Sequence, residues 1–313
     1  SLLGQLPEEQ PLGLQPSDLG ALPPLSLDPA AGKYGRGRLL LLAGSDRYRG
    51  AAALALLGAD ASGCGSLKAA LPEAVASELW RWLPHAVLQR SLTSDTAGNL
   101  TLTALAAADL ERLDALLLGP GIGCPTGEPS PDEAEAWQRL LAFPGLLVLD
   151  ADGLNRIHAT WLQQRTGPTW ITPHAGEFAR LFPAIADLPP LEAATHAARQ
   201  SGAAVLLKGA HTVVATPDGR RWQLLQSAPA SARTGLGDVL AGYAAGRGAM
   251  VMASGAAADG CWLAAAALAH AHAGVRLQEQ GTVASPERVA QMLTLQDIQS
   301  REAATLSGDL RTW

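Results

Sequence analysis

The chain has 313 residues and a formal net charge of −6, with 48% hydrophobic and 17% charged residues. This hydrophobic content can bury a sizeable core, and the length fits one large α/β domain. The acidic balance argues against binding to nucleic acid or to an anionic membrane surface, because both require clustered lysine and arginine.

The cysteines and the apolar segments restrict the class of protein further. The three cysteines lie far apart and form no CxxC pair, which argues against a zinc finger or a disulfide framework. The most apolar segment, 260–275, is too short and too polar to span a bilayer. These features predict a cytoplasmic protein.

In chain order, the sequence divides into a lead-in, a domain and a tail. Residues 1–32 contain many leucines and prolines with little periodicity, which indicates an extended lead-in or a linker. A folded domain is expected over 33–300 and a C-terminal tail over 301–313. Within the domain, apolar runs predict strands at 38–44, 114–121, 145–152, 169–174 and 203–211. Helices are expected between and after them, at 50–62, 131–142, 191–201, 237–248 and 256–276.

The continuous apolar character of these predicted strands indicates the fold class. Continuous apolar runs are typical of strands that are buried on both faces of a parallel sheet covered by helices. The stretch TVVATPDGRRWQLL (212–225) instead predicts a hairpin around its Pro-Asp-Gly turn. Alternating strands and helices therefore predict an α/β protein with three αβα layers and a mostly parallel central sheet.

Polar residues follow most of the predicted strands. In an open parallel sheet, ligands bind beyond the carboxyl ends of the strands. Any one of these residues has a simpler explanation as a turn or cap residue, but a row of them along one edge favours a functional site. The row comprises Asp46, Asp150, Asp152, Asn155, His174, Glu177, Lys208 and Thr212.

The stretch RTGLGDVLAG (233–242) carries the most specific signal. A glycine-rich turn that leads into a helix exposes backbone N–H groups, which can bind an anion. Asp238 stands within this turn, and two interpretations are open: it caps the helix, or it performs chemistry on the bound anion. The sequence lacks GxxxxGK[ST] and GxSxG, which excludes a Walker-type phosphate loop and the nucleophile elbow of hydrolases.

Several of these motifs together resemble one family. AGSDRYRGAAALAL, DALLLGPGIG, LLVLDADGLN, WITPHAGEFARLF, VLLKGAHTVVATPDG and TGLGDVLAG follow, in order and spacing, the NAD(P)H-hydrate dehydratase family of the ribokinase-like superfamily. The resemblance runs from about Lys33 to about Leu293. The lead-in also resembles the linker that joins an epimerase domain to this domain in bifunctional members.

The resemblance implies a ribokinase-like fold and a repair reaction on damaged coenzyme. Members of the family restore NADH or NADPH from the S form of the coenzyme hydrated at C6 of the nicotinamide ring. ADP or ATP, with Mg²⁺, phosphorylates the ring hydroxyl, and phosphate then leaves as a better leaving group than hydroxide. An NAD(P)H-hydrate epimerase, fused or separate, is the implied partner, and assembly within the superfamily favours a homo-oligomer.

Roles in the family transfer to individual positions of this chain. The resemblance assigns the role of catalytic base to Asp238. It also makes Asp238 a substrate-binding residue. It assigns substrate contacts to Ala51 or Ala52, Gly121 and His174. It assigns nucleotide contacts to Lys208, Gly209, Ala210, His211, Thr212, Gly235 and Gly237. Glu177 matches a glutamate that related kinases place near the magnesium shell.

The chain also departs from the family pattern, and two other functions stay open. Arg49 and Ala175 stand where family members commonly have proline, and the stretch 227–234 lacks the usual Asn-Pro-Gly. One alternative is a ribokinase-like kinase that acts on a sugar or vitamin-precursor alcohol, against which His174 argues. The other is a non-catalytic nucleotide-binding module, which the changes at 227–234 favour.

Overall fold

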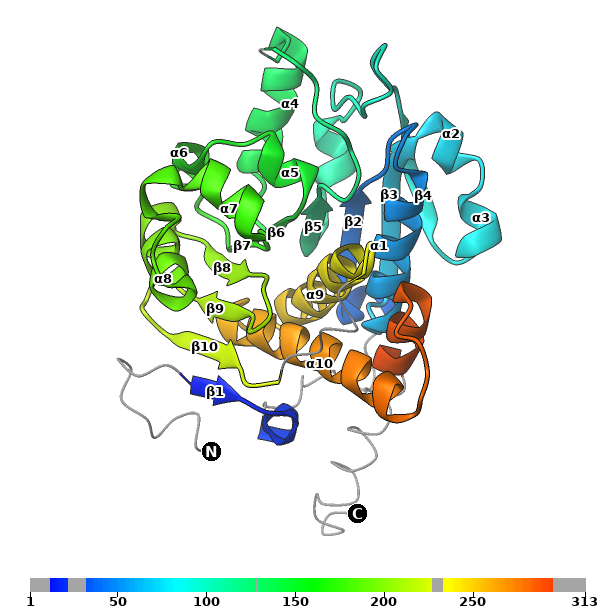
Figure 1. Cartoon of the computed structure of the whole chain (residues 1–313). Helices are drawn as coiled ribbons and strands as arrows, with labels where there is room; N and C mark the ends of the chain where they lie inside the picture. Colours follow the sequence, from blue (N-terminus) through cyan, green and yellow to red (C-terminus); the bar gives the residue numbers. More distant parts are fainter. Residues whose placement is uncertain (1–11, 22–31, 128, 227–232, 295–313) are drawn as a thin grey trace.

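The computed structural model describes residues 12–21, 32–127, 129–226 and 233–294, and its strands form one twisted sheet (Figure 1). The strand order is β1-β10-β9-β8-β7-β6-β5-β2-β3-β4. All neighbouring strands are parallel except β9, which is antiparallel to both β8 and β10. The strands are β1 (Leu12–Leu14), β2 (Arg38–Leu42), β3 (Ser66–Pro72), β4 (Val87–Leu92), β5 (Ala115–Leu118), β6 (Leu146–Leu149), β7 (Thr169–Ile171), β8 (Ala204–Leu207), β9 (Val213–Ala215) and β10 (Arg221–Leu224).

Both faces of the sheet are buried, because side chains alternate between two hydrophobic clusters. Leu39 and Leu41 of β2 belong to one cluster, and Leu40 and Leu42 belong to the other. The first cluster packs against α1 (Arg49–Ala61), α9 (Leu236–Ala253), α10 (Gly260–Glu279) and a helical segment at 286–294. The second packs against α4 (Pro131–Leu141), α5 (Asp152–Asn155), α6 (Ala159–Leu162), α7 (Ala175–Leu181) and α8 (Pro190–Ser201). This arrangement confirms the three-layer αβα fold.

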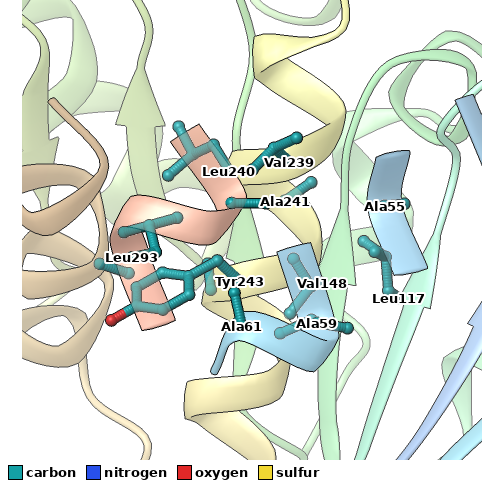
Figure 2. Packing of buried hydrophobic residues seen from close by; sticks show 14 of the residues in the cluster. Ala55, Ala59, Ala61, Leu117, Val148, Val239, Leu240, Ala241, Tyr243 and Leu293 are labelled. Atoms are coloured by element: carbon teal, nitrogen blue, oxygen red, sulfur yellow. The ribbon is translucent and has the colours of Figure 1, made fainter. Parts of the chain in front are cut away.

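The central helix α9 is held against α1 by close backbone contact. A Cβ atom on Gly58 would lie 2.1 Å from the Val239 carbonyl oxygen, and one on Gly242 would lie 1.9 Å from the Ala55 carbonyl oxygen. Small residues therefore let the two helices touch, and they run in the same direction. Figure 2 shows Ala55 and Ala59 of α1 and Val239 and Ala241 of α9 as members of one hydrophobic cluster, with Leu117 and Val148 of the sheet. This packing fixes the amino-terminal end of α9 at the carboxyl edge of the sheet.

The predicted strands and helices are confirmed at each predicted place, although the strands end earlier than the apolar runs suggested. The 212–225 hairpin is formed by β9 and β10. The sequence patterns did not indicate β3, β4 or α7, nor the short helices α2 (Glu73–Ala76), α3 (Leu79–Trp82), α5, α6, η2 (Pro16–Ala21), η3 (Lys33–Arg36), η4 (Ala107–Leu110) and η5 (Pro183–Ile185).

The lead-in contributes a strand of its own. Residues 12–14 form β1, which pairs with β10, and the Leu225 N–H donates to the Leu14 carbonyl at 3.0 Å. Residues 1–11 and 22–31 of the predicted lead-in, residues 227–232 of the altered stretch and the tail at 301–313 lie outside the described residues. Within the described part, no helix combines the length and the apolar character that crossing a membrane would require.

Candidate active site

The strand order places the predicted polar residues in one row. Because β8, β7, β6, β5 and β2 are consecutive and parallel, their carboxyl ends share one edge of the sheet. Along that edge lie Lys208 after β8, His174 after β7, Asp150 after β6, Gly121 after β5 and Ser45 after β2. The amino-terminal turn of α9, with Asp238, meets this row near Lys208 and Asp150, both of which shift the pKa of Asp238.

Lys208 is held in place by a buried carboxylate. Its ammonium nitrogen lies 2.7 Å from Asp150 Oδ1 and 3.9 Å from Glu177 Oε2. Asp150 is only 1% exposed, and the Thr172 hydroxyl also donates to its Oδ1 at 2.8 Å. The sequence placed Asp150 in the polar row without giving it a role, and the structure identifies it as the partner of Lys208.

Asp238 lies in an environment that holds its proton near neutral pH. Burial raises the pKa of Asp238 to about 7, and the negative charges of Asp150, Asp152 and Glu177 add to this rise, whereas Lys208 opposes it. A carboxylate with a pKa near the working pH suits a general base, because it can accept a proton and release it again. The sequence alone could not separate this role from helix capping.

The position of Asp238 within α9 is also relevant to the capping interpretation. The residue in the N-cap position of α9 is Gly235, in the left-handed region at φ 91°, and Asp238 belongs to the first turn of the helix. A side chain at Gly235 would collide with Leu54 of α1, since an added Cβ would lie 2.4 Å from its Cδ1. A Cβ on Gly237 would lie 3.6 Å from the Lys208 nitrogen. The two glycines therefore leave backbone without side chains beside Lys208 and Asp238.

His270 lies behind the glycine turn, on α10. Burial lowers the pKa of His270 to about 4, although a hydrogen bond with the backbone of Leu236 opposes the change. The imidazole is therefore neutral at physiological pH and adds no charge beside the anion site. No pattern in the sequence indicated this contact, because it depends on how α10 packs on α9.

Glycines bring α1 close to the loop after β5. Gly121 has a left-handed backbone at φ 65°, and a Cβ on it would lie 2.6 Å from Ala51 Cβ and 2.8 Å from Tyr48 Cβ. Ala51 and Gly121, two of the predicted substrate contacts, are thus neighbours. Ala52 is fully buried and faces Gly44, where an added Cβ would lie 2.9 Å from Ala52 Cβ. Of the two alanines, Ala51 is the one placed beside Gly121.

The loop after β5 is tied to the loop after β6. Asp152 accepts the Gly123 N–H at 2.8 Å, and the buried guanidinium of Arg156 donates to the Gly123 carbonyl at 2.7 Å and to the Ile122 carbonyl at 2.8 Å. Ala151, in the loop after β6, has a positive φ of 47°, which is costly for a residue other than glycine. The hydrogen bonds therefore hold the two loops together on this side of the row.

The predicted nucleotide loop follows β8. The Thr212 hydroxyl donates to the Gly209 carbonyl at 3.2 Å, and the His211 ring lies 3.2 Å from the Leu224 carbonyl oxygen. Gly209 and Ala210 are exposed, and among the described residues no atom other than those of its chain neighbours lies within 4 Å of a Cβ built on Gly209. The backbone next to Lys208 is therefore open at Gly209.

His174 caps α7 as well as lining the row. Its Nδ1 accepts the N–H groups of Gly176 and Glu177 at 3.0 and 3.3 Å, and Glu177 Oε2 accepts the His174 N–H at 2.8 Å. The imidazole is 60% exposed, and its Nε2 lies 3.2 Å from Glu177 Oε1. Because Nδ1 accepts hydrogen bonds, a neutral His174 carries its proton on Nε2.

The match to known proteins covers almost the whole described domain. The family model described as NAD(P)H-hydrate dehydratase matches residues 39–295. The chain belongs to the NAD(P)H-hydrate dehydratase family. This membership confirms the resemblance drawn from the motifs, and it favours a dehydratase over the kinase and the non-catalytic module.

Curated relatives of this dehydratase-family chain are longer than the chain itself. The bifunctional NAD(P)H-hydrate repair enzyme Nnr of Gloeobacter violaceus is 45% identical over 70% of this chain and 42% of its own length. That of a Synechocystis species is 41% identical over 83% of this chain and 48% of its own length. The chain spans about half the length of the relatives that it matches.

Solved structures have the same fold. The ADP/ATP-dependent NAD(P)H-hydrate dehydratase of Bacillus subtilis, co-crystallised with ATP and Mg²⁺, superposes with a TM-score of 0.73 at 25% identity. The match covers 92% of this chain and 98% of that protein. A ribokinase-like superfamily protein of Enterococcus faecalis, at 21% identity and a TM-score of 0.73, shows the shared fold alone.

Proposed function

We propose that the chain catalyses the nucleotide-dependent dehydration of (S)-NAD(P)H hydrate to NAD(P)H, with Asp238 as the general base. The observation that supports this most directly is the position of Asp238, whose pKa of about 7 results from burial among carboxylates, on a glycine turn beside Lys208. A helix cap needs neither the raised pKa nor the open backbone. Family membership supplies the substrate class.

The proposed reaction proceeds in two steps. In the first, Asp238 accepts the proton of the ring hydroxyl at C6, and the hydroxyl oxygen attacks the terminal phosphoryl group of ADP or ATP. AMP or ADP leaves with the electron pair of the broken P–O bond. In the second, the ring nitrogen donates its lone pair, the C6–O bond breaks and inorganic phosphate leaves; loss of the C5 proton then gives NAD(P)H. Gly235 and Gly237 offer backbone N–H groups to the transferred phosphoryl group, and Lys208 lies beside them.

Mg²⁺ fits the charge balance of this site. Asp150, Glu177 and Asp238 outnumber the one neighbouring lysine, so a nucleotide polyphosphate needs additional positive charge to bind there. No cluster of three or more His, Cys, Asp or Glu side chains able to hold a metal occurs in the described part of the chain. This agrees with an ion held by nucleotide phosphates, water and one or two carboxylates, of which Glu177 is the predicted one. When bound, Mg²⁺ supplies charge neutralisation on the phosphates.

The longer relatives suggest the setting of the reaction. The curated relatives are named bifunctional repair enzymes, and this chain matches a little under half of each of the two described above. We propose that the chain acts with an NAD(P)H-hydrate epimerase, which converts the R hydrate to the S hydrate.

All three cysteines are free thiols, in keeping with the reducing conditions of the cytoplasm.

One assay tests the function directly. The protein is incubated with hydrated NADH and Mg²⁺ plus either ADP or ATP, and absorbance in the NADH band is followed while the nucleotide product is identified. Recovery of NADH with release of AMP or ADP and phosphate is the expected result. ATP consumption on a sugar or vitamin-precursor alcohol, with no recovery of NADH, would indicate the kinase instead, and nucleotide binding without any turnover would indicate the non-catalytic module.

His174 provides a prediction that separates capping from substrate binding. We expect His174→Ala to lose about 1 kcal/mol of unfolding free energy, because α7 loses its cap, and also to bind the reduced coenzyme more weakly. His174→Asn should restore the stability, since asparagine caps well, but not the coenzyme affinity. Thermal melts with NADPH titrations measure both effects, and ADP affinity serves as the control. Unchanged NADPH affinity in both variants would reduce His174 to a cap.

A further inference from the structure

The turn before α1 presents an exposed aromatic ring and an arginine. Tyr48 is 46% exposed, and the Arg47 guanidinium lies over its ring, 5.4 Å from the ring centroid. All residues from 46 to 50 are exposed. Neither side chain takes part in the proposed reaction, although Tyr48 adjoins Gly121, one of the predicted substrate contacts.

Hydrogen bonds fix the shape of this turn. The Tyr48 N–H donates to Ser45 Oγ at 3.2 Å, and the Arg49 Nε–H donates to the Asp46 carbonyl at 3.1 Å. The Asp46 N–H donates to the Gly98 carbonyl at 3.0 Å, and the Ser94 hydroxyl donates to the Asp46 carboxylate at 3.0 Å. An exposed aromatic ring on a turn held in this way is preorganised for a ligand.

The turn lies at the end of the row that is farther from the nucleotide loop. Tyr48 packs on Gly121 after β5, whereas Lys208 follows β8, and β6 and β7 separate these two strands in the sheet. The ring therefore cannot belong to the site around Lys208. Tyr48 borders the part of the row where Ala51 and Gly121 are predicted to contact the coenzyme.

The glycine next to Asp238 lies at the nucleotide end of the row, since a Cβ on Gly237 would be 3.6 Å from the Lys208 nitrogen. Lys208 follows β8, whereas Tyr48 packs on the loop after β5. With the reacting ring at Asp238, the second nucleotide of the same coenzyme is the part that extends toward Tyr48.

We propose that Tyr48 and Arg47 form a subsite for the non-reacting nucleotide of the hydrated coenzyme. The Tyr48 ring stacks on its base, and Arg47 pairs with a phosphate of the dinucleotide. This proposal rests on the proposed function of the site. It makes the turn before α1 responsible for the preference for a dinucleotide over a mononucleotide.

The test compares two substrates of different length, hydrated NADH and hydrated reduced nicotinamide mononucleotide. Tyr48→Ala should raise KM for hydrated NADH about tenfold, the loss expected for one base–aromatic stack, with kcat little changed. KM for the mononucleotide should stay the same, because it has no second base. Tyr48→Phe should behave as the wild type on both substrates, since phenylalanine keeps the stacking face.

A matched control lies at the other end of the molecule. Tyr34 is 58% exposed and has Lys33 over its ring at 5.1 Å, but it belongs to η3, which packs against the carboxyl-terminal part of α9. Tyr34→Ala should leave both KM values unchanged. An unchanged KM for hydrated NADH in Tyr48→Ala, or an equal rise for both substrates, overturns the subsite.

A binding experiment keeps this proposal separate from the proposed function. If the wild type converts neither substrate, the proposed function fails, and calorimetry with NADH and reduced nicotinamide mononucleotide still tests the subsite. Weaker binding of NADH alone by Tyr48→Ala supports the subsite, and equal binding of NADH by variant and wild type overturns it.

Discussion

Replacing Asp238 with asparagine is expected to reduce turnover of hydrated NADH by roughly 10²–10⁴-fold, the range typical for loss of a positioned general base. Asparagine caps helices about as well as aspartate, so a capping role predicts almost no change. Single-turnover conversion with saturating ADP, and then with ATP, measures the loss. A variant as active as the wild type would show that Asp238 has no catalytic role.

The same variant should be more stable than the wild type above neutral pH. Burial raises the pKa of Asp238 to about 7 from 3.8, so the folded protein holds this proton where the unfolded chain has released it. The wild type therefore loses stability as pH rises from about 4 to about 7, and the loss is complete above that range. The asparagine side chain carries no charge, so we expect Asp238→Asn to gain roughly 1–3 kcal/mol at pH 8 and little at pH 4. Denaturant unfolding at both pH values measures the difference, and equal stability at pH 8 would contradict the raised pKa.

In the wild type, activity should fall as pH drops below about 7, because the base must be deprotonated to accept a proton. The pH dependence of kcat/KM reports this titration in the free enzyme. Removal of the Lys208 charge should move the acid limb to higher pH, since Lys208 lowers the pKa of Asp238. If the acid limb lies at the same pH in Lys208→Ala and in the wild type, Lys208 does not influence the pKa of Asp238.

Lys208→Ala is expected to lower both stability and nucleotide affinity. The change leaves Asp150, 1% exposed, without its partner at 2.7 Å, and an unpaired buried charge costs about 3–5 kcal/mol of unfolding free energy. Loss of a charge-assisted hydrogen bond to phosphate should weaken ADP and ATP binding by roughly 1.5–3 kcal/mol. Calorimetry and denaturant unfolding measure the two effects independently.

Two further variants show where the Lys208 effect comes from. Lys208→Ala combined with Asp150→Asn should recover much of the stability, because the buried carboxylate is gone, but not the nucleotide affinity. Lys33→Ala removes a lysine from the exposed η3 turn and should change neither quantity. Nucleotide affinity that is unaffected in Lys208→Ala would remove the lysine from the phosphate site and leave it as a partner of Asp150.

Sequence patterns alone were enough to predict the three layers of the fold and the edge of the sheet that carries the row of polar residues. Continuous apolar runs bounded by glycine, aspartate and proline were enough to place the central strands, because a strand buried on both faces has no polar positions. The polar residues after those strands were recognisable because each of them follows an apolar run directly. Strand β4 was missed because it is an edge strand whose exposed positions break the apolar pattern, and β3 was missed because half-buried Ser66 and Lys68 interrupt its apolar run.

Folding determines which polar residues of the row come into contact. Asp150, Thr172 and Lys208 lie on three different β segments, and only the order β8-β7-β6 brings them within hydrogen-bonding distance. The raised pKa of Asp238 likewise depends on burial and on carboxylates that are distant in sequence. The contact of Tyr48 with Gly121 depends on the seam between α1 and α9 and on the neighbouring position of β5 and β2. Sequence periodicity reports what each segment buries, whereas the charge around a side chain depends on groups that only folding brings together.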